Sequence, residues 1–142
     1  MPDADLACVC SDLRKATRVV TRLYDEALAG YGLTVTQFAI LRTCARLGEP
    51  TLSGLAKAMV MDRTSLYRTL GPMIEHGWIE VVPAVSGHVK RASVTAAGRE
   101  LTQTAEAGWR AVQDRFVDAF GRADWVQVSA GLQKVLSVIG VG

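Results

Sequence analysis

The chain has 142 residues, of which 49% are hydrophobic and 21% charged, and 16 Lys and Arg against 14 Asp and Glu give a formal charge of +2. This composition excludes an intrinsically disordered chain, and the length suits a single domain. No apolar run approaches the roughly 18–20 residues that span a bilayer. The acidic N-terminus is unlike a signal peptide, and three cysteines do not suit a disulfide-stapled secreted fold. We therefore expect a soluble, cytoplasmic protein that does not associate with membranes.

The charged residues are unevenly distributed along the chain. Residues 34–99 hold eight basic and four acidic side chains, a net charge of +4, whereas residues 1–33 and residues 100–142 each hold four basic and five acidic ones, a net charge of −1. Because a local excess of Lys and Arg attracts polyanions, the middle of the chain is the part expected to meet one.

A long amphipathic helix is predicted over residues 6–28. Its apolar side chains recur at alternating steps of three and four residues, which forms a heptad-like seam. The residues of this seam are Leu6, Val9, Leu13, Ala16, Val20, Leu23 and Ala27. Gly30 and Gly32 end the helix.

A second helix is predicted over about residues 35–47. Thr34 and Gln37 have the spacing of a capping box, in which each side chain satisfies a free backbone N–H group at the start of a helix. The side chains expected to be buried on this helix are Phe38, Leu41 and Ala45.

Two further short helices follow. Thr51 or Ser53 is expected to cap a helix that ends near Met59, and Asp62 to cap a helix over about 63–76. Each of these side chains carries an oxygen that accepts a hydrogen bond from a backbone N–H group of the first turn.

The pattern then changes to that of a β-ribbon. Residues 78–82 and 90–94 are short runs rich in β-branched and aromatic side chains, and the residues between them include Pro83 and Gly87. Such runs favour strands, and Pro and Gly favour the turn that joins them.

Two helices complete the chain. Thr95 is expected to cap a long helix over about 96–120, which Gly121 ends, and the run from Asp124 to Gln127 has the spacing of a second capping box. The apolar residues of the last helix again alternate at steps of three and four: Trp125, Val128, Leu132, Val135 and Ile139.

This order of elements predicts a mainly α-helical fold with a small β-ribbon, organised as one domain over 1–142. Three short helices followed by a ribbon form a winged helix-turn-helix, here over about 34–99. Long helices over about 4–30 and 96–139 flank this core, and their apolar seams exceed what the small core needs. We expect them to form a homodimer; the alternative is that the first helix packs on the last two within one chain.

Five short motifs occur in order along the chain. They are Gly32-Leu33-Thr34-x-x-Gln37-Phe38-x-x-Leu41, Leu52-Ser53-x-Leu55-Ala56, Met61-Asp62-Arg63-Thr64-Ser65-Leu66, Gly77-Trp78-Ile79-Glu80 and Val94-Thr95-x-x-Gly98-Arg99. Together they resemble the MarR (multiple antibiotic resistance regulator) family of bacterial transcription factors over roughly residues 6–138. The resemblance implies a dimer that binds a pseudo-palindromic operator in double-stranded DNA. It also implies a regulator, usually a repressor, released by a small phenolic effector or by oxidation.

The helix after Asp62 is the candidate for reading DNA. Leu66 and Leu70 share its inward face, so five other side chains of its first two turns are expected to project outward or to lie near the helix N-terminus: Arg63, Thr64, Ser65, Tyr67 and Arg68. Arginine bonds guanine at two atoms, and hydroxyl groups reach base edges or phosphates. The alternative interpretation is an ordinary solvated helix face.

Helix starts elsewhere in the core are candidates for phosphate contacts. Thr36, Gln37 and Ser53 lie where free N–H groups attract anions, although their first role is expected to be in capping.

At the wing tip, the family usually carries an Asp-x-Arg pair whose arginine enters the minor groove. The corresponding residues here are Ser86 and His88, and histidine is mostly neutral at pH 7. Lys90 and Arg91 lie on the strand behind the tip, so we expect wing contacts to be weaker or to shift to these two residues.

The cysteines leave several alternatives open. Cys10 lies where the hydroperoxide-sensing branch of the family has its reactive cysteine, and Tyr24 at one of the two tyrosines that hold it. Arg14 replaces the other tyrosine, but a cation one turn from a thiol lowers the thiol pKa and raises its reactivity. The alternatives are that Cys8 and Cys10 are small apolar residues of the helix seam, or that they form a soft metal site. The metal site is disfavoured because two residues this close in sequence point to different faces of a helix. Cys44 is expected to be a core residue.

A small-molecule pocket is a further possibility. Tyr31, Met59 and Trp109 are its candidates, together with Tyr24 and Trp125, although such residues at helical spacing are more often core.

Enzyme and cofactor motifs are absent from the sequence, including a phosphate-binding glycine loop, His-Glu-x-x-His and Gly-x-Ser-x-Gly. We therefore expect neither an enzyme nor a cofactor or metal site. The main rival to a DNA-binding regulator is a winged-helix interaction module without specific DNA binding. A thiol oxidoreductase that uses Cys8 and Cys10 is disfavoured, because neither opens a helix after a strand.

Overall fold

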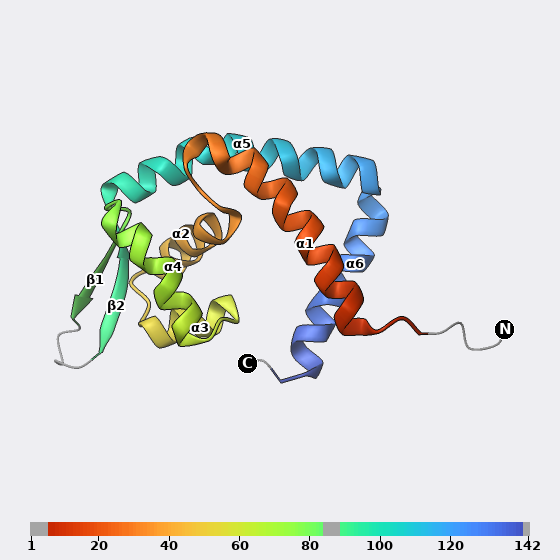
Figure 1. The fold of residues 1–142 in the computed structure, drawn as a ribbon, viewed down its shortest axis with the longest axis horizontal. Coiled ribbons are helices and arrows are strands. Elements are labelled where there is room, and N and C mark those ends of the chain that lie inside the picture. The colour runs from red at the N-terminus through yellow and green to blue at the C-terminus, as the bar shows by residue number, and fades with distance from the viewer. Residues whose placement is uncertain (1–5, 84–88, 141–142) are drawn as a thin grey trace.

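The computed structural model describes residues 6–83 and 89–140. Its elements, in chain order, are α1 (Val9–Leu28), the 3-10 turn η1 (Ala29–Tyr31), α2 (Val35–Leu47), α3 (Leu52–Met59), α4 (Arg63–Glu75), β1 (Ile79–Pro83), β2 (Lys90–Val94), α5 (Ala96–Phe120) and α6 (Arg122–Val138). Figure 1 shows α5 spanning one side of the molecule, with α2 to α4 and the ribbon below its first half. Helices α1 and α6 extend to the side away from the ribbon. The fold is a winged helix-turn-helix with long flanking helices, as predicted.

Short polar side chains set where four helices begin. Thr34 and Gln37 form the predicted capping box at α2, with Thr34 Oγ1 accepting from the Gln37 N–H group at 3.1 Å. Asp62 caps α4 and Thr95 caps α5, as expected. At α3 the cap is Thr51, whose hydroxyl accepts from the Gly54 N–H group at 2.9 Å, and not Ser53, the second of the two candidates.

The hydrophobic core lies where α2, α3 and α4 meet the ribbon and α5. Its most completely buried large side chains include Phe38, Ile40, Leu41, Leu55, Leu66, Leu70, Met73 and Ile79. The expected burial of Ala45 is wrong, because this residue is exposed, and Cys44 is buried in its place. Helix α2 contacts α3, α4 and β2 as well as α1 and α5, so it is buried on more than one side. Its buried residues therefore do not follow from one apolar face alone.

The ribbon is an antiparallel pair joined to the rest of the core. Its register pairs Ile79 with Val94 and Pro83 with Lys90. The Ala92 N–H group also donates to the Pro50 carbonyl at 2.9 Å, so β2 is hydrogen bonded to the loop between α2 and α3. The wing is therefore fixed to the core through the middle of β2.

The ends of the two flanking helices differ from the prediction. Helix α1 begins at Val9 rather than at residue 6, because Cys8 has a non-helical backbone (φ −57°, ψ 114°); among the described residues, no side chain caps the helix. The predicted capping box from Asp124 to Gln127 is wrong. Gly121, with φ +103°, both ends α5 and begins α6, so Asp124 lies inside the first turn of α6.

The apolar seams of the flanking helices are largely uncovered in one chain. Helix α6 buries none of its side chains, and α1 buries only Tyr24 and Leu28. Side chains that remain exposed on these helices include Val9, Val19, Val126, Val128, Leu132 and Leu136. None of the helices in the described part of the chain is long and apolar enough to cross a membrane.

Candidate nucleic-acid interface

Helix α4 presents a polar surface opposite its buried face. Leu66 and Leu70 are buried, whereas Arg63, Thr64 and Arg68 are exposed and Tyr67 is 48% exposed. Four of the five residues that the sequence predicted to project outward or to lie near the helix N-terminus are therefore exposed. Nothing in the described part of the chain forms an ion pair with either arginine.

Ser65 is the exception. It is half-buried, its N–H group donates to Asp62 Oδ1 and its hydroxyl donates to Asp62 Oδ2, both at 2.8 Å. These two hydrogen bonds also lower the pKa of the Asp62 carboxyl. Ser65 is thus part of the α4 cap, and because its hydroxyl proton is directed at Asp62, the hydroxyl could meet DNA as an acceptor but not as a donor.

Arg63 is bound to the neighbouring helix. Its Nη2 atom donates to Ser53 Oγ of α3 at 2.6 Å. Beside this contact lies a groove where α3, α4 and β2 meet, with a volume of about 390 Å³. The lining residues, called the α3–α4–β2 groove below, are Thr51, Leu52, Ser53, Arg63, Tyr67, Val89 and Lys90.

The residues predicted on the wing have separate surroundings. Lys90 is exposed and lines the α3–α4–β2 groove. Arg91 is half-buried, and its Nη1 atom donates to the Glu49 carbonyl at 2.8 Å, which binds β2 to the loop after α2. Ser86 and His88, the predicted wing-tip residues, lie outside the described residues.

Thr36 and Gln37 lie apart from this surface. The Gln37 side chain accepts from the Thr34 N–H group at 3.0 Å, and both residues follow Val35, whose N–H group donates to Asp25 Oδ1 at 2.7 Å. The structure therefore places them at the junction of α1 and α2 rather than in the α3–α4–β2 groove. The sequence carried no signal for the long-range contact of Asp25.

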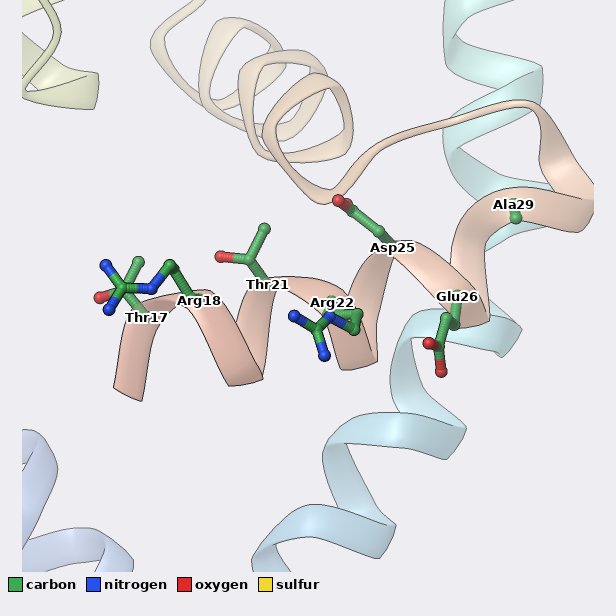
Figure 2. Close-up of a pocket in the computed structure, with 7 residues that line it drawn as sticks. All are labelled: Thr17, Arg18, Thr21, Arg22, Asp25, Glu26 and Ala29. Carbon is green, nitrogen blue, oxygen red and sulfur yellow. The ribbon is translucent and has the colours of Figure 1, made fainter. Parts of the chain in front are cut away.

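A second groove follows α1 itself, with a volume of about 580 Å³. It is lined by Thr17, Arg18, Thr21, Arg22, Asp25, Glu26 and Ala29. Figure 2 shows Asp25 pointing towards the start of α2, where its hydrogen bond to Val35 connects the flanking helix to the winged core. This groove is on the polar side of α1, and most of its lining residues are polar or charged.

The three thiols fall into two environments. Cys8 and Cys10 are exposed, whereas Cys44 is 1% exposed and its thiol donates to the Ala92 carbonyl at 3.4 Å. Burial first, and the carboxylate of Glu49 second, raise the pKa of Cys44 to about 11. The prediction that Cys44 is a core residue is confirmed.

Tyr24 is not close to Cys10 within one chain. The residues are 14 positions apart on α1, which corresponds to about 21 Å along a helix that rises 1.5 Å per residue. The Tyr24 hydroxyl instead hydrogen bonds Gln113 Oε1 of α5, and burial raises the pKa of this phenol. Arg14 is exposed on α1, four residues from Cys10. A thiol site that includes Tyr24 would need a second chain to complete it.

The predicted pocket residues contribute to packing. Tyr31, Met59 and Trp109 are partly buried against the hydrophobic core, the alternative that the sequence left open. The Arg42 guanidinium lies over the Trp109 ring, 4.5 Å from its centroid. A Cβ atom at Gly108 would lie 2.6 Å from the Tyr31 ring, so this glycine lets Tyr31 pack directly on α5.

Comparisons with known proteins agree on one class of protein. A family model described as MarR family matches residues 33–86. The transcriptional regulator MosR from M. tuberculosis is 32% identical with a TM-score of 0.83, over 96% of this chain and 98% of that chain. MosR has also been solved in complex with DNA, in a structure with a TM-score of 0.75 at 32% identity over 90% of this chain and 98% of that chain.

A further solved structure resembles the chain in fold. CouR from Rhodococcus jostii RHA1, bound to p-coumaroyl-CoA, has a TM-score of 0.76 at 21% identity, over 91% of each chain. The comparison with curated proteins produced no match.

Proposed function

Because the chain belongs to the MarR family of transcriptional regulators, we propose that it is a homodimeric repressor that binds a specific DNA operator and is released by a small effector or by thiol oxidation. Proteins of this family act as transcription factors, so the function is one of binding rather than catalysis.

The exposed surface of α4 is the observation that carries the DNA-binding proposal. Arg63, Thr64, Tyr67 and Arg68 project from a helix whose opposite side is anchored in the core, beside a ribbon that supplies Lys90. Arginine and hydroxyl side chains on such a helix match the donors and acceptors of the major groove. The DNA complex of MosR, a relative of 32% identity, supports DNA binding by this chain.

Dimerisation is proposed through α1, α5 and α6. The exposed apolar side chains of α6 have no covering element among the described residues, and burial of such a surface against a second copy is favourable. A two-fold dimer places two copies of α4 on the same side, and its half-sites are expected about 34–36 Å apart. The winged core over about 34–99 would then be the DNA-binding part of the single domain.

Control by oxidation is supported by the exposure of Cys8 and Cys10. A thiolate that attacks a hydroperoxide takes one oxygen atom, releases an alcohol and becomes a sulfenic acid, which condenses with a second thiol to a disulfide and water. Cys8 precedes the first helical turn, so its side chain is not held at a helical angle relative to Cys10. A change here would alter the start of α1 and hence the dimer seam.

Control by a small molecule is the second route. The solved structure of CouR with p-coumaroyl-CoA indicates that this fold accommodates an aromatic acyl ligand in another protein. Because Tyr31, Met59 and Trp109 pack against the core here, a pocket formed by them would require movement of α5 relative to α2.

The first test measures specific binding. An operator selected from random duplexes is titrated with the protein by fluorescence anisotropy, against a scrambled duplex of the same composition. Arg68→Ala should cost on the order of 1–3 kcal/mol on the operator and relax selection at one base pair. Arg110→Ala is the control once sedimentation shows that it is still a dimer, because Arg110 is exposed on α5 and pairs, among the described residues, with Glu106 of the same helix. A monomer by sedimentation, or equal binding of both duplexes, contradicts the proposal and favours an interaction module.

The second test separates the two routes of control. Operator binding is measured before and after stoichiometric cumene hydroperoxide in the wild type, Cys8→Ser and Cys10→Ser. Release that requires Cys10 supports the thiol switch. If the oxidised wild type keeps its affinity, the thiols are structural, and a set of phenolic acids and their CoA esters is then screened for release.

A further inference from the structure

We propose that the α3–α4–β2 groove holds one phosphate of the DNA backbone, gripped by Arg63 and Lys90, while Arg68 is left to read base edges. This inference rests on the proposed function, because it assigns different DNA contacts to two arginines of one helix: a backbone phosphate to Arg63 and base edges to Arg68. Ser53 is a positioning residue that fixes the Arg63 guanidinium.

The hydrogen bond to Ser53 decides the direction of Arg63. Its Nη2 atom lies 2.6 Å from Ser53 Oγ, so the guanidinium is held across the gap between α4 and α3. Bidentate recognition of guanine needs a guanidinium directed at the floor of the major groove. Arg63 has five N–H donors, of which Ser53 takes one, and the others remain available for phosphate oxygens.

The geometry of α4 separates the two arginines. Since a helix turns by about 100° per residue, Arg63 and Arg68 lie roughly 140° apart around α4, whereas Arg63 and Tyr67 are about 40° apart. This agrees with the groove, which Arg63 and Tyr67 line and Arg68 does not. The exposed surface of α4 therefore has one edge facing α3 and β2, with Arg63 and Tyr67, and another edge with Thr64 and Arg68.

The charge of the groove suits a phosphodiester. The described residues that line it include two cations, Arg63 and Lys90, and no carboxylate. The adjacent acid, Asp62, directs its two carboxylate oxygens at the N–H and hydroxyl groups of Ser65. Charge-assisted hydrogen bonds from a fixed guanidinium to phosphate oxygens are stronger than neutral ones and carry no sequence information. The Tyr67 hydroxyl is a further donor at the same edge.

The expected signature is a loss of affinity without a loss of selectivity. Arg63→Ala and Lys90→Ala should each weaken binding about tenfold on the operator and on the scrambled duplex alike, and should each flatten the salt dependence by about one unit of slope. Arg68→Ala is the matched control, since it removes the same charge from the other edge of α4 and should act mainly on the operator. Ser53→Ala should weaken both duplexes less than Arg63→Ala, and Ser53→Thr, which keeps the hydroxyl, should bind as wild type does.

A chemical scan of the DNA identifies the phosphate. Methylphosphonate replaces single phosphates of the operator in turn, and binding is measured with wild type and Arg63→Ala. We expect one position per half-site at which the replacement weakens wild type about tenfold but has little effect on Arg63→Ala. The melting temperature of each variant is measured alongside, and Lys90→Ala provides the same readout should Arg63→Ala fail to fold.

Two results would overturn the assignment. If Arg63→Ala relaxes selection at one base pair and leaves the scrambled duplex unaffected, Arg63 reads a base. If no methylphosphonate position loses its effect in either Arg63→Ala or Lys90→Ala, the groove holds no phosphate. In both cases the wild type still binds the operator more tightly than the scrambled duplex, so the proposed function stands and only the phosphate site is refuted. If the wild type instead binds both duplexes equally, the proposed function itself fails, and the phosphate site fails with it.

Discussion

Gly98, at the start of α5, is the residue where a single added methyl group is expected to do the most damage. A Cβ atom there would overlap the backbone carbonyl oxygen of Trp78 and lie 2.9 Å from Val94 Cγ1. Carbon and oxygen normally approach to about 3.3 Å, so the carbonyl would have to retreat by roughly an ångström. The same oxygen accepts from the Thr95 N–H group at 3.0 Å, so its displacement strains the start of α5.

The magnitude follows from two opposing effects. An extra methyl group in a packed site costs about 1–3 kcal/mol of stability. We expect the upper end of this range here, because the atom in the way is a backbone oxygen, which cannot move aside by a change of side-chain rotamer. Alanine gains back up to about 1 kcal/mol over glycine in a helix. Gly98→Ala should therefore lower the free energy of unfolding by about 2 kcal/mol, or lower the melting temperature by about 4–8 °C.

The assay is urea unfolding at one fixed protein concentration, since the stability of a dimer depends on concentration. Gly71→Ala is the control, because Gly71 is inside α4 and a Cβ atom there would have no neighbour within 4 Å apart from the adjoining residues of the chain. Alanine gains helix propensity over glycine, but the Pro72 ring disfavours a helical backbone for a preceding residue that has a Cβ atom. Because the two effects oppose each other, this variant should change the free energy of unfolding by less than about 1 kcal/mol. If Gly98→Ala is as stable as Gly71→Ala, the contact between the wing base and α5 is looser than the structure indicates and the reasoning fails.

Three further outcomes are expected. Val60 is a β-branched residue at φ +52° with a 52% exposed side chain, so Val60→Asn should stabilise the protein by about 1 kcal/mol in thermal unfolding; an unchanged melting temperature would contradict this. Asp25→Ala removes the acceptor of the Val35 N–H group and should cost about 1–2 kcal/mol, whereas Glu26→Ala, on the exposed side of α1, should be neutral. Burial raises the pKa of the Cys44 thiol from 9.0 to about 11, so between these values the unfolded chain loses this proton while the folded chain keeps it. The free energy of unfolding of the wild type should therefore be unaffected by this thiol below pH 9 and should fall as the pH rises towards 11. The fall should be smaller in Cys44→Ala. At pH 8 an alkylating reagent should modify two thiols per folded chain.

Local chemistry allowed the sequence to determine most of the fold. The caps Thr34, Asp62 and Thr95 act on backbone groups within three residues, so their roles follow from spacing alone. The same holds for the inward face of α4, since Leu66 and Leu70 are one turn apart. The prediction for α6 failed where one residue served two elements, because Gly121 ends α5 and begins the next helix without a linker.

Only the tertiary structure decided which polar side chains are free to bind a ligand. Arg63 meets Ser53 across 10 residues, Arg91 meets the Glu49 carbonyl across 42, and Tyr24 meets Gln113 across 89. Such pairings depend on how helices and strands are placed relative to one another, which no local pattern encodes. For this reason the sequence indicated that Arg63, Arg91 and Tyr24 are candidate site residues, but only the arrangement of the elements in space decided their contacts. Arg63 lines the α3–α4–β2 groove, Arg91 holds β2 to the loop after α2, and Tyr24 packs against α5.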